Sequence, residues 1–276
     1  MPFRGDERDA LKLRSNLDAL ATRPDDELIV ADNTLDGVAG PALGTAARVL
    51  RATGEPSAYH ARNAGASVAS RDWLLFLDAD CTPASSLLDA YFDPPPPERC
   101  GLVGGRIADL AEQRTLLARY TASRHFYCAE HGLQRDEGFA TTANLLVRRA
   151  AFERAGGFAE GIRSAGDVDL CWRLQAAGWT LERRAGASVA HRHRDDLRSF
   201  ASMIVRYGAG ASWLNRRYPG SSPRWPLSAR ELARAMRDAV RHTAGGDREE
   251  AAFRVLDALG LIAHNVGYAA RNEISR

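Results

Sequence analysis

The chain has 276 residues and a mass of 30.1 kDa, with 45% hydrophobic and 26% charged residues and a formal net charge of +2 at pH 7. These values exclude a disordered chain or a fibre, and the length allows one large domain or two small ones. The longest strongly apolar run, residues 73–77, is far shorter than the roughly 20 residues that span a bilayer, and the first residues do not resemble a signal peptide. We therefore expect a cytoplasmic protein.

The basic residues are almost all arginine, because Lys12 is the one lysine among 37 basic residues. Individual arginines are therefore weak evidence of function. Residues 192–241 nevertheless hold eleven arginines against four acids, which gives this segment a local charge of +7. The segment either forms solvated helix faces or attracts phosphates or an anionic membrane surface.

The first half of the chain is predicted to alternate helices with strands. The apolar spacing and the turn residues predict a helix at 7–21, a strand at 28–31, a helix at 41–52, a strand at 57–59, a helix at 62–69 and a buried strand at 73–77. This alternation indicates an α/β fold with a largely parallel sheet between helices. Ligands bind such sheets at the carboxyl ends of the strands, where this chain places acids: Asp32, Asp78 and Asp80.

The second half begins after the stiff proline run 94–97, which is predicted to be a surface spacer. We predict a strand at 102–107, a helix at 112–128, an apolar segment at 141–148, helices at 150–155 and 167–177, strands at 179–181 and 188–190, and helices from 195 onward. The last helix, at 249–271, carries an apolar stripe that is either a core-docking face or a membrane or partner surface: Ala252, Val255, Leu256, Leu259, Ile262, Ala263 and Val266.

The cysteines form no Cys-x-x-Cys pair and lie in apolar segments. We therefore expect buried reduced thiols rather than disulfides or a zinc site at Cys81, Cys100, Cys128 and Cys171.

Asp78-Ala79-Asp80 is the strongest local signal for chemistry. Residues i and i+2 of an extended strand end point the same way, so the two carboxylates can converge on one hard cation. Mg²⁺ or Mn²⁺ held by few carboxylates keeps coordination positions open for substrate phosphates. The same triplet could instead cap a helix that begins near Ala84.

Four segments together resemble glycosyltransferase family 2, a group with the GT-A fold. They are residues 59–80, which begin Tyr59-His-Ala-Arg-Asn, and residues 141–149, 156–158 and 167–174. They follow the family's order, and the resemblance covers most of residues 2–218. It implies a Rossmann-like, mostly parallel sheet flanked by helices over residues 1–194, with a donor half at 1–110, an acceptor half at 111–194 and a helical C-terminal extension at 195–276.

The resemblance also implies the ligands. A bacterial enzyme of this kind takes a nucleotide-diphosphate sugar as donor and a divalent metal, Mn²⁺ or Mg²⁺, as cofactor. The acceptor stays open between a small molecule, a lipid and a glycan. We expect no nucleic-acid partner, and a peripheral contact with the inner membrane face stays open.

The resemblance gives roles to residues of the donor half. Asp32 matches the acid that contacts the nucleoside, and Arg62 and Asn63 fall near the donor. Asp78 and Asp80 match the metal and diphosphate site. In the acceptor half, Asn144 lies in the loop that lines the sugar pocket.

Asp167 matches the family's catalytic base, although Gly166 replaces the usual preceding glutamate. The chemistry agrees, because a sugar hydroxyl needs a carboxylate to take its proton as the bond to the diphosphate breaks. Without the resemblance, Asp167 would read as an acid favoured by the dipole at a helix N-terminus. Asp169 is expected to be a structural partner.

His191 and His193 follow the strand predicted at 188–190. In many GT-A enzymes a late histidine completes the metal site, and we favour His191 for this role over packing at the strand end. The following stretch Arg206-Tyr207-Gly208-Ala-Gly210 resembles bacterial family members, with Tyr207 as an amphipathic anchor and the glycines at a close helix contact.

Pro2-Phe3-Arg4 resembles the turn that follows the first strand of the family, so that strand is expected to be missing from residues 1–276. Its loss would leave the Asp32 strand without one neighbour, and a chain extended upstream should be more stable and more active.

These features favour an inverting, metal-assisted glycosyltransferase. The alternative is a non-catalytic relative that binds a sugar nucleotide or a protein partner, which the missing strand and Gly166 favour. A metal-dependent phosphohydrolase is less well supported, because no second cluster of acids or histidines is evident.

Overall fold

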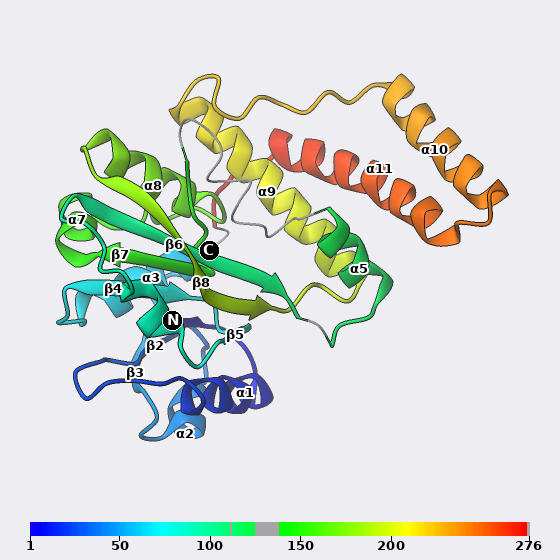
Figure 1. The fold of residues 1–276 in the computed structure, drawn as a ribbon. Helices are drawn as coiled ribbons and strands as arrows, with labels where there is room; N and C mark the ends of the chain where they lie inside the picture. The colour runs from blue at the N-terminus through cyan, green and yellow to red at the C-terminus, as the bar shows by residue number, and fades with distance from the viewer. Residues whose placement is uncertain (111, 125–137, 275–276) are drawn as a thin grey trace.

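The structure is a computed structural model that describes residues 1–110, 112–124 and 138–274. Figure 1 shows its elements, which in chain order are β1 (Pro2–Phe3), α1 (Glu7–Asp18), β2 (Ile29–Asp32), α2 (Ala39–Leu43), β3 (Arg48–Arg51), α3 (Ala58–Ser67), β4 (Trp73–Leu77), β5 (Cys81–Pro83), α4 (Leu87–Phe92), β6 (Cys100–Asp109), α5 (Leu116–Ser123), β7 (Asn144–Arg148), α7 (Arg149–Arg154), α8 (Gly166–Ala176), β8 (Thr180–His191), α9 (Leu197–Arg217), α10 (Ala229–Ala244) and α11 (Arg248–Ala269).

The strands form two sheets, a parallel one in the order β1-β2-β3 and a mixed one in the order β4-β7-β6-β8-β5. In the mixed sheet β6 runs parallel to β8, whereas β7 is antiparallel to β4 and β6, and β5 is antiparallel to β8. The predicted α/β fold is confirmed. The sequence did not reveal the antiparallel strands, because a buried apolar run looks the same in either direction.

The first residues of the chain occupy the position beside β2. Pro2 pairs with Ala31 and Phe3 with Asp32, in parallel. The expectation of an empty slot beside the Asp32 strand is therefore wrong, since β2 has β1 on one side and β3 on the other. No strand pairing joins β1 to β4 among the described residues, so the two sheets remain separate.

Two predicted elements between β2 and β4 are also wrong. The helix predicted at 41–52 stops at Leu43, because Gly44 adopts a positive φ of 54° and ends it, and Arg48–Arg51 then forms β3. The strand predicted at 57–59 is the start of α3. Ser57 is its N-cap, and its side chain accepts a hydrogen bond from the Tyr59 backbone N–H at 3.2 Å.

The strands predicted at 179–181 and 188–190 are the two ends of one strand, β8, whose register against β6 shifts between Gly105 and Arg106. The helix predicted at 112–128 is the shorter α5. Cys128 and most of the loop at 130–138 lie outside the described residues. The other three cysteines are buried free thiols, as predicted.

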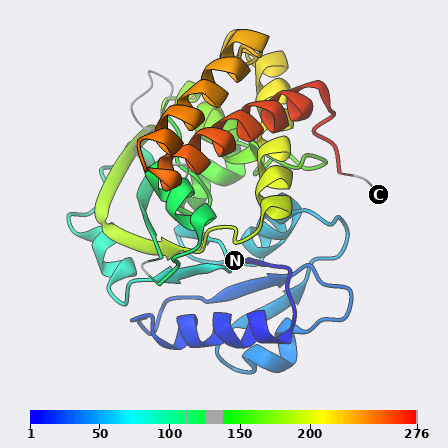
Figure 2. The same ribbon diagram turned by 90° about the vertical axis from the view of Figure 1, so that its right-hand side faces the viewer.

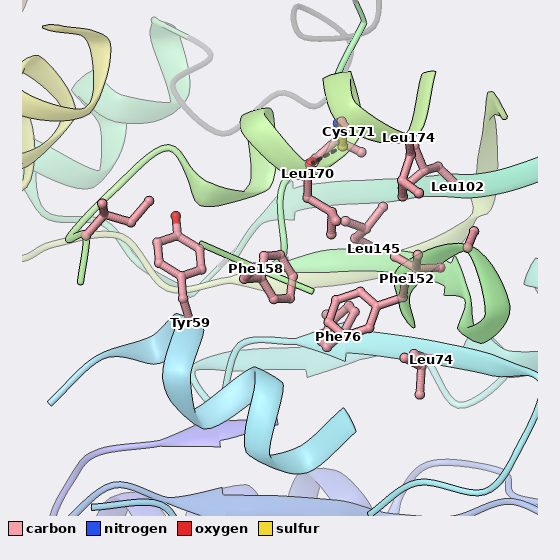
Figure 3. Close-up of a cluster of buried hydrophobic side chains, with 14 residues drawn as sticks. Tyr59, Leu74, Phe76, Leu102, Leu145, Phe152, Phe158, Leu170, Cys171 and Leu174 are labelled. Carbon is pink, nitrogen blue, oxygen red and sulfur yellow. Dashed lines mark hydrogen bonds between the residues drawn. The ribbon is translucent and has the colours of Figure 1, made fainter. Parts of the chain in front are cut away.

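The main core lies between α3, the mixed sheet, α7 and α8. Figure 3 shows its buried side chains, which bring Tyr59 of α3 and Phe76 of β4 against Phe152 of α7 and Phe158. The ring centroids of Phe76 lie 5.3 Å from Phe152 and 5.0 Å from Phe158, distances typical of favourable aromatic pairs. A second cluster joins α1 and α2 to the parallel sheet.

The helices α9, α10 and α11 lie together over one end of the sheets (Figure 2). Their division from residues 1–194 as a separate extension stays a prediction. The predicted core-docking stripe of α11 is only partly buried: Leu256 is buried, but Val255, Leu259, Ile262 and Val266 face outward, and Val266 is 57% exposed. The contact faces instead use Phe253, which packs in a cluster with α5 and α9, and small residues that an apolar periodicity does not reveal.

The glycines after Arg206 lie at a close helix contact, as predicted. A Cβ on Gly208 of α9 would lie 2.0 Å from the His264 carbonyl oxygen of α11, and a Cβ on Gly267 would lie 1.9 Å from the Val205 carbonyl oxygen. Both obstacles are backbone atoms, which cannot rotate away. The two helices can therefore cross at this distance only because both positions are glycine.

We predict that Gly208→Ala lowers the free energy of unfolding by about 1–3 kcal/mol, because the added methyl group pushes α9 and α11 apart. Chemical denaturation measures the change. Gly40→Ala in α2 is the control, since a Cβ there meets nothing within 4 Å, and it should not destabilise the protein. Equal stability of the two variants would contradict the close contact.

Candidate functional site

A cavity of about 1040 Å³ lies where the ends of β4 and β8 meet α3, α8 and α9. Five of the predicted site residues line it: Arg62, Asp78, Asp80, Asp167 and His191. Three do not: Asp32, Asn63 and Asn144.

Asp78 follows β4 and forms an ion pair with Arg62 of α3. The Arg62 side chain is 5% exposed, so its guanidinium is nearly shielded from water and depends on this carboxylate. The chain turns directly after Asp78, because the Cys81 N–H donates to the Asp78 carbonyl oxygen at 3.1 Å. Asp78 and Asp80 thus stand in a turn rather than along an extended strand, and their carboxylates meet different partners.

Asp80 faces His191 at the end of β8, with 3.6 Å between its Oδ1 atom and the His191 Nε2 atom. The antiparallel pairing of β5 with β8 brings them together, since Cys81 is opposite His191. Burial raises the pKa of Asp80, the neighbouring His191 imidazole lowers it, and the nearby Asp78 carboxylate raises it further. A bound cation would relieve this repulsion between carboxylates.

Asp80 and His191 fit a divalent cation. The ligand atoms of Asp80, Cys81 and His191 all lie within 4.8 Å of one another. Burial raises the pKa of the Cys81 thiol, which stays protonated and donates weakly to the Ala143 carbonyl oxygen. One carboxylate and one imidazole suit Mn²⁺ better than Mg²⁺ and leave positions for phosphate oxygens.

His193 turns away from this pair. Its Nε2 atom lies 2.8 Å from the Asp109 Oδ1 atom at the end of β6. The two imidazoles therefore serve different carboxylates, and of the two histidines only His191 lies beside Asp80. Both histidines are buried. The sequence could not distinguish them, because they stand two residues apart after the same predicted strand.

Asp167 lies in the first turn of α8 and lines the same cavity as Arg62. Burial raises the pKa of Asp167, while the Arg62 charge and the backbone N–H groups of Val168 and Thr142 oppose this shift. The Val168 N–H donates to its Oδ1 atom at 3.0 Å. A carboxylate with a raised pKa is a stronger base, which suits proton abstraction near neutral pH.

Asp169 has the structural role expected for it. It is fully buried, its Oδ2 atom accepts from Arg173, and its Oδ1 atom accepts from Arg217 and Tyr218, each at 2.8 Å. Asp167 and Asp169 thus have different surroundings. Asp167 lines the cavity, whereas Asp169 is bonded between α8 and the end of α9.

Asp32 is fully buried, and the protein itself surrounds its carboxylate. Its Oδ1 atom accepts from the N–H and hydroxyl of Thr34, and its Oδ2 atom accepts from the Ala39 N–H and pairs with Arg51. The next residue, Asn33, lines the cavity instead. A nucleoside contact by Asp32 stays a prediction.

Asn63 and Asn144 hold backbone segments together. Asn63 bonds in both directions with the Phe158 backbone and donates to Glu160, which ties α3 to the loop after α7. Asn144 donates to the carbonyl oxygens of Arg106 and Ala187 and accepts from the Tyr91 hydroxyl. Their predicted part in donor binding is not tested by these contacts.

Sequence reasoning missed other residues of the cavity wall, among them Asn33, Tyr59 and Arg194. Asn33 follows the predicted site residue Asp32, and Tyr59 stands three residues before Arg62. The motifs therefore indicated where these two residues lie but not what they contact. Arg194 offered no signal in a chain whose basic residues are almost all arginine.

The family model described as "Glycosyl transferase family 2" matches residues 9–156, slightly more than half of the chain. A protein named pre-mycofactocin glycosyltransferase in two strains of Mycobacterium tuberculosis is 36% identical in an alignment of 171 residues that covers 58% of this chain and 35% of that protein. Glycosyltransferase AglE of Haloferax volcanii is 31% identical over 128 residues, 46% of this chain and 41% of AglE. The matches thus span well under half the length of these relatives.

Solved structures share the fold at low sequence identity. The mannosyltransferase PcManGT of Pyrobaculum calidifontis, in complex with GDP-Man and Mn²⁺, has a TM-score of 0.65 at 17% identity and covers 97% of this chain and 85% of its own. Glucosyl-3-phosphoglycerate synthase of M. tuberculosis, in complex with Mn²⁺, UDP-Glc and phosphoglyceric acid, has a TM-score of 0.54 at 15% identity, over 83% and 86% of the two chains.

We predict that Mn²⁺ raises the melting temperature of the protein in the presence of a nucleoside diphosphate, and that Asp80→Ala removes this increase, because the variant lacks the carboxylate of the Asp80–His191 pair. Thermal unfolding with and without MnCl₂ measures it. Asp72→Ala, at the opposite end of β4, is the control and should keep the increase. An unchanged Mn²⁺ effect in Asp80→Ala would place the metal elsewhere.

Proposed function

The chain belongs to glycosyl transferase family 2, and from that premise we propose that it is an inverting glycosyltransferase that moves a sugar from a nucleotide-diphosphate donor to an acceptor hydroxyl with the help of a divalent metal. One observation carries the proposal: a cation-binding pair, Asp80 with His191, and a potential base, Asp167, line the same cavity. The nucleotide sugars and Mn²⁺ bound by the structural neighbours support it.

In this proposal Asp167 accepts the proton of the acceptor hydroxyl as that oxygen attacks the anomeric carbon of the sugar. The bond from the anomeric carbon to the diphosphate oxygen breaks, and the diphosphate leaves with the bonding electrons. A single displacement of this kind needs a base but no nucleophilic side chain, and it inverts the anomeric configuration.

Asp80 and His191 would hold the metal, which when bound neutralises charge on the departing diphosphate. Arg62 interacts with two carboxylates of the cavity. It forms an ion pair with Asp78, and its charge lowers the pKa of Asp167. Its guanidinium keeps Asp167 ionised for proton transfer and adds positive charge near the diphosphate.

The acceptor side of the cavity is lined from α8 and α9 by Trp172, Met203, Tyr207 and Leu214, with Arg206 among them. This wall favours an acceptor with an apolar or aromatic body, which Arg206 could orient through an anionic group. The identities of the sugar, the nucleotide base and the acceptor stay open. A screen of nucleotide sugars would identify the first two.

A non-catalytic relative is the alternative that Gly166 favours. Donor binding without any transfer, across a panel of donors and acceptors with Mn²⁺, would support it over the enzyme. A metal-dependent phosphohydrolase would need a second metal-binding cluster. Within the described residues, the site holds one group of three side chains able to bind a metal, so this alternative loses support.

We predict that Asp167→Asn keeps donor affinity but lowers turnover by roughly 10²-fold or more, since the amide cannot accept the proton. Turnover of the unchanged protein should also fall as the pH drops through the raised pKa of Asp167, because protonation removes the base. Kinetics across pH and donor titrations measure both. Transfer at the original rate in Asp167→Asn would move the base to another residue.

The same variant separates chemistry from stability. A carboxylate whose pKa is raised by folding opposes folding once it is ionised, so Asp167→Asn should increase the free energy of unfolding at neutral pH. Asp169→Asn is the matched contrast. It leaves Arg173 and Arg217 short of a buried partner and should destabilise the protein by about 3–5 kcal/mol.

We also propose a peripheral contact between α10 and an anionic membrane surface, and a cytoplasmic location that brings the two together. Arg230, Arg234, Arg237 and Arg241 form one row along α10, and Met236 and exposed Val240 form a second row about a third of a turn away. Basic and apolar rows side by side are typical of helices that lie in a membrane interface. Among the described residues, none of the helices is long and apolar enough to cross a membrane.

We predict that the protein sediments with vesicles of anionic phosphatidylglycerol but not with neutral phosphatidylcholine vesicles at low salt. Replacing the four arginines of α10 by glutamine should weaken this binding by at least about tenfold, because each basic residue contributes about 1 kcal/mol near such a surface. Retention by both vesicle types alike, or unchanged binding of the quadruple variant, would contradict the contact.

A further inference from the structure

Tyr59 is the second residue of α3 and is 7% exposed, but its hydroxyl does not point into the apolar core. Figure 3 shows its ring beside Phe158 at the edge of the buried cluster, with the oxygen directed away from the other rings. The Tyr59 and Phe158 ring centroids are 5.5 Å apart, and the Arg62 guanidinium lies 5.4 Å from the Tyr59 ring. Both groups also lie beside each other, 6.0 Å apart, so the Tyr59 ring packs against an arginine and an aromatic ring that are themselves in contact.

The hydroxyl meets the start of α8. The Gly166 N–H, the first of that helix, donates a hydrogen bond to the Tyr59 hydroxyl at 2.9 Å. A helix leaves its first N–H groups without partners inside the helix, and an N-cap side chain usually accepts one of them. Here the N-cap is Ala165, which has no side-chain oxygen and adopts a left-handed φ of 72°.

Tyr59 of α3, 107 residues earlier, therefore supplies the acceptor for the Gly166 N–H. The next residue of that helix is Asp167, so the bond fixes the backbone one residue before the proposed base. The left-handed conformation of Ala165 costs free energy for a residue with a Cβ, and it needs such surrounding contacts to persist.

The ring also explains the residue at 166. A Cβ there would lie 2.8 Å from both the Cε1 and Cζ atoms of Tyr59, closer than such contacts allow. The ring is buried in the main core and packs against Phe158 and Arg62, so moving it aside would disturb these contacts. A side chain at position 166 would therefore clash with the Tyr59 ring, and the glycine suits the tyrosine that faces it.

We propose that Tyr59 is a positioning residue for Asp167: its hydroxyl caps α8 and its ring fixes the backbone at Gly166, so that the two residues form one interdependent unit. The consequence for turnover rests on the proposed function, because it needs Asp167 to act as the base. The capping of α8 and the interdependence of the two residues do not.

Tyr59→Phe tests the cap, since it keeps the ring and removes the oxygen. We expect turnover to fall about tenfold while donor affinity stays within twofold, because the base is displaced and the donor site is not. Amide hydrogen exchange at Gly166 and Asp169 should become faster, since the first turn of α8 loses its acceptor. Tyr120→Phe is the control: it removes a hydroxyl bonded to Asp257 in the helical end of the protein and should change neither property.

A second pair of variants tests the ring. Gly166→Ala should lower the melting temperature of the original protein, yet should cost much less in the Tyr59→Leu background, where the atoms that block the methyl group are gone. Additive effects of the two substitutions would overturn the interdependence. Unchanged turnover together with unchanged exchange at α8 in Tyr59→Phe would overturn the cap.

The measurements separate this inference from the proposed function. If the original protein transfers no sugar, the exchange rates and the double-mutant cycle still decide whether Tyr59 holds α8. If transfer is present, exchange changes in Tyr59→Phe and turnover does not, then α8 is capped as proposed but the position of Asp167 does not limit the reaction, and the positioning role is refuted.

Discussion

A nearly buried guanidinium, that of Arg62, is the interaction around which the cavity is arranged. An arginine does not lose its proton inside a protein, so its burial requires carboxylates close by. Asp78 supplies one at the end of β4, and Asp167 supplies a second charge from α8. The need to compensate one positive charge thus brings the end of β4 and the start of α8 to the same point.

The aromatic rings beside Arg62 make this arrangement rigid. Its guanidinium lies 5.4 Å from the Tyr59 ring and 6.0 Å from the Phe158 ring, and both rings belong to the main core. The charged centre is therefore anchored in packed side chains rather than in a mobile loop. Rigid support of this kind is what a site needs if it is to present a base and a cation pair at fixed positions.

Sequence reasoning worked where the signal was local. The apolar run of β4 and the short helix that begins near Asp167 were both predicted correctly, because periodicity and turn residues act over a few neighbours. It failed where distant contacts decided the outcome. Arg48–Arg51 becomes a strand because β2 offers a partner, and the outer stripe of α11 stays exposed because glycines let its other face approach α9. In the sequence, Gly166 stands where the family usually has a glutamate. The structure shows that a side chain there would clash with the Tyr59 ring.

The last residues described do more than follow α11. Asn272 bonds through its side chain to the backbone of Ser164 in both directions and to the Arg163 N–H, and the Ile274 N–H donates to the Gly161 carbonyl oxygen. These bonds fasten the loop that leads into Ala165 and Asp167, while the glycine crossing ties α11 to α9. Contacts therefore cross the boundary predicted near residue 194. The residues after α11 therefore contact the loop before α8 directly, and this connection does not pass through the sheet.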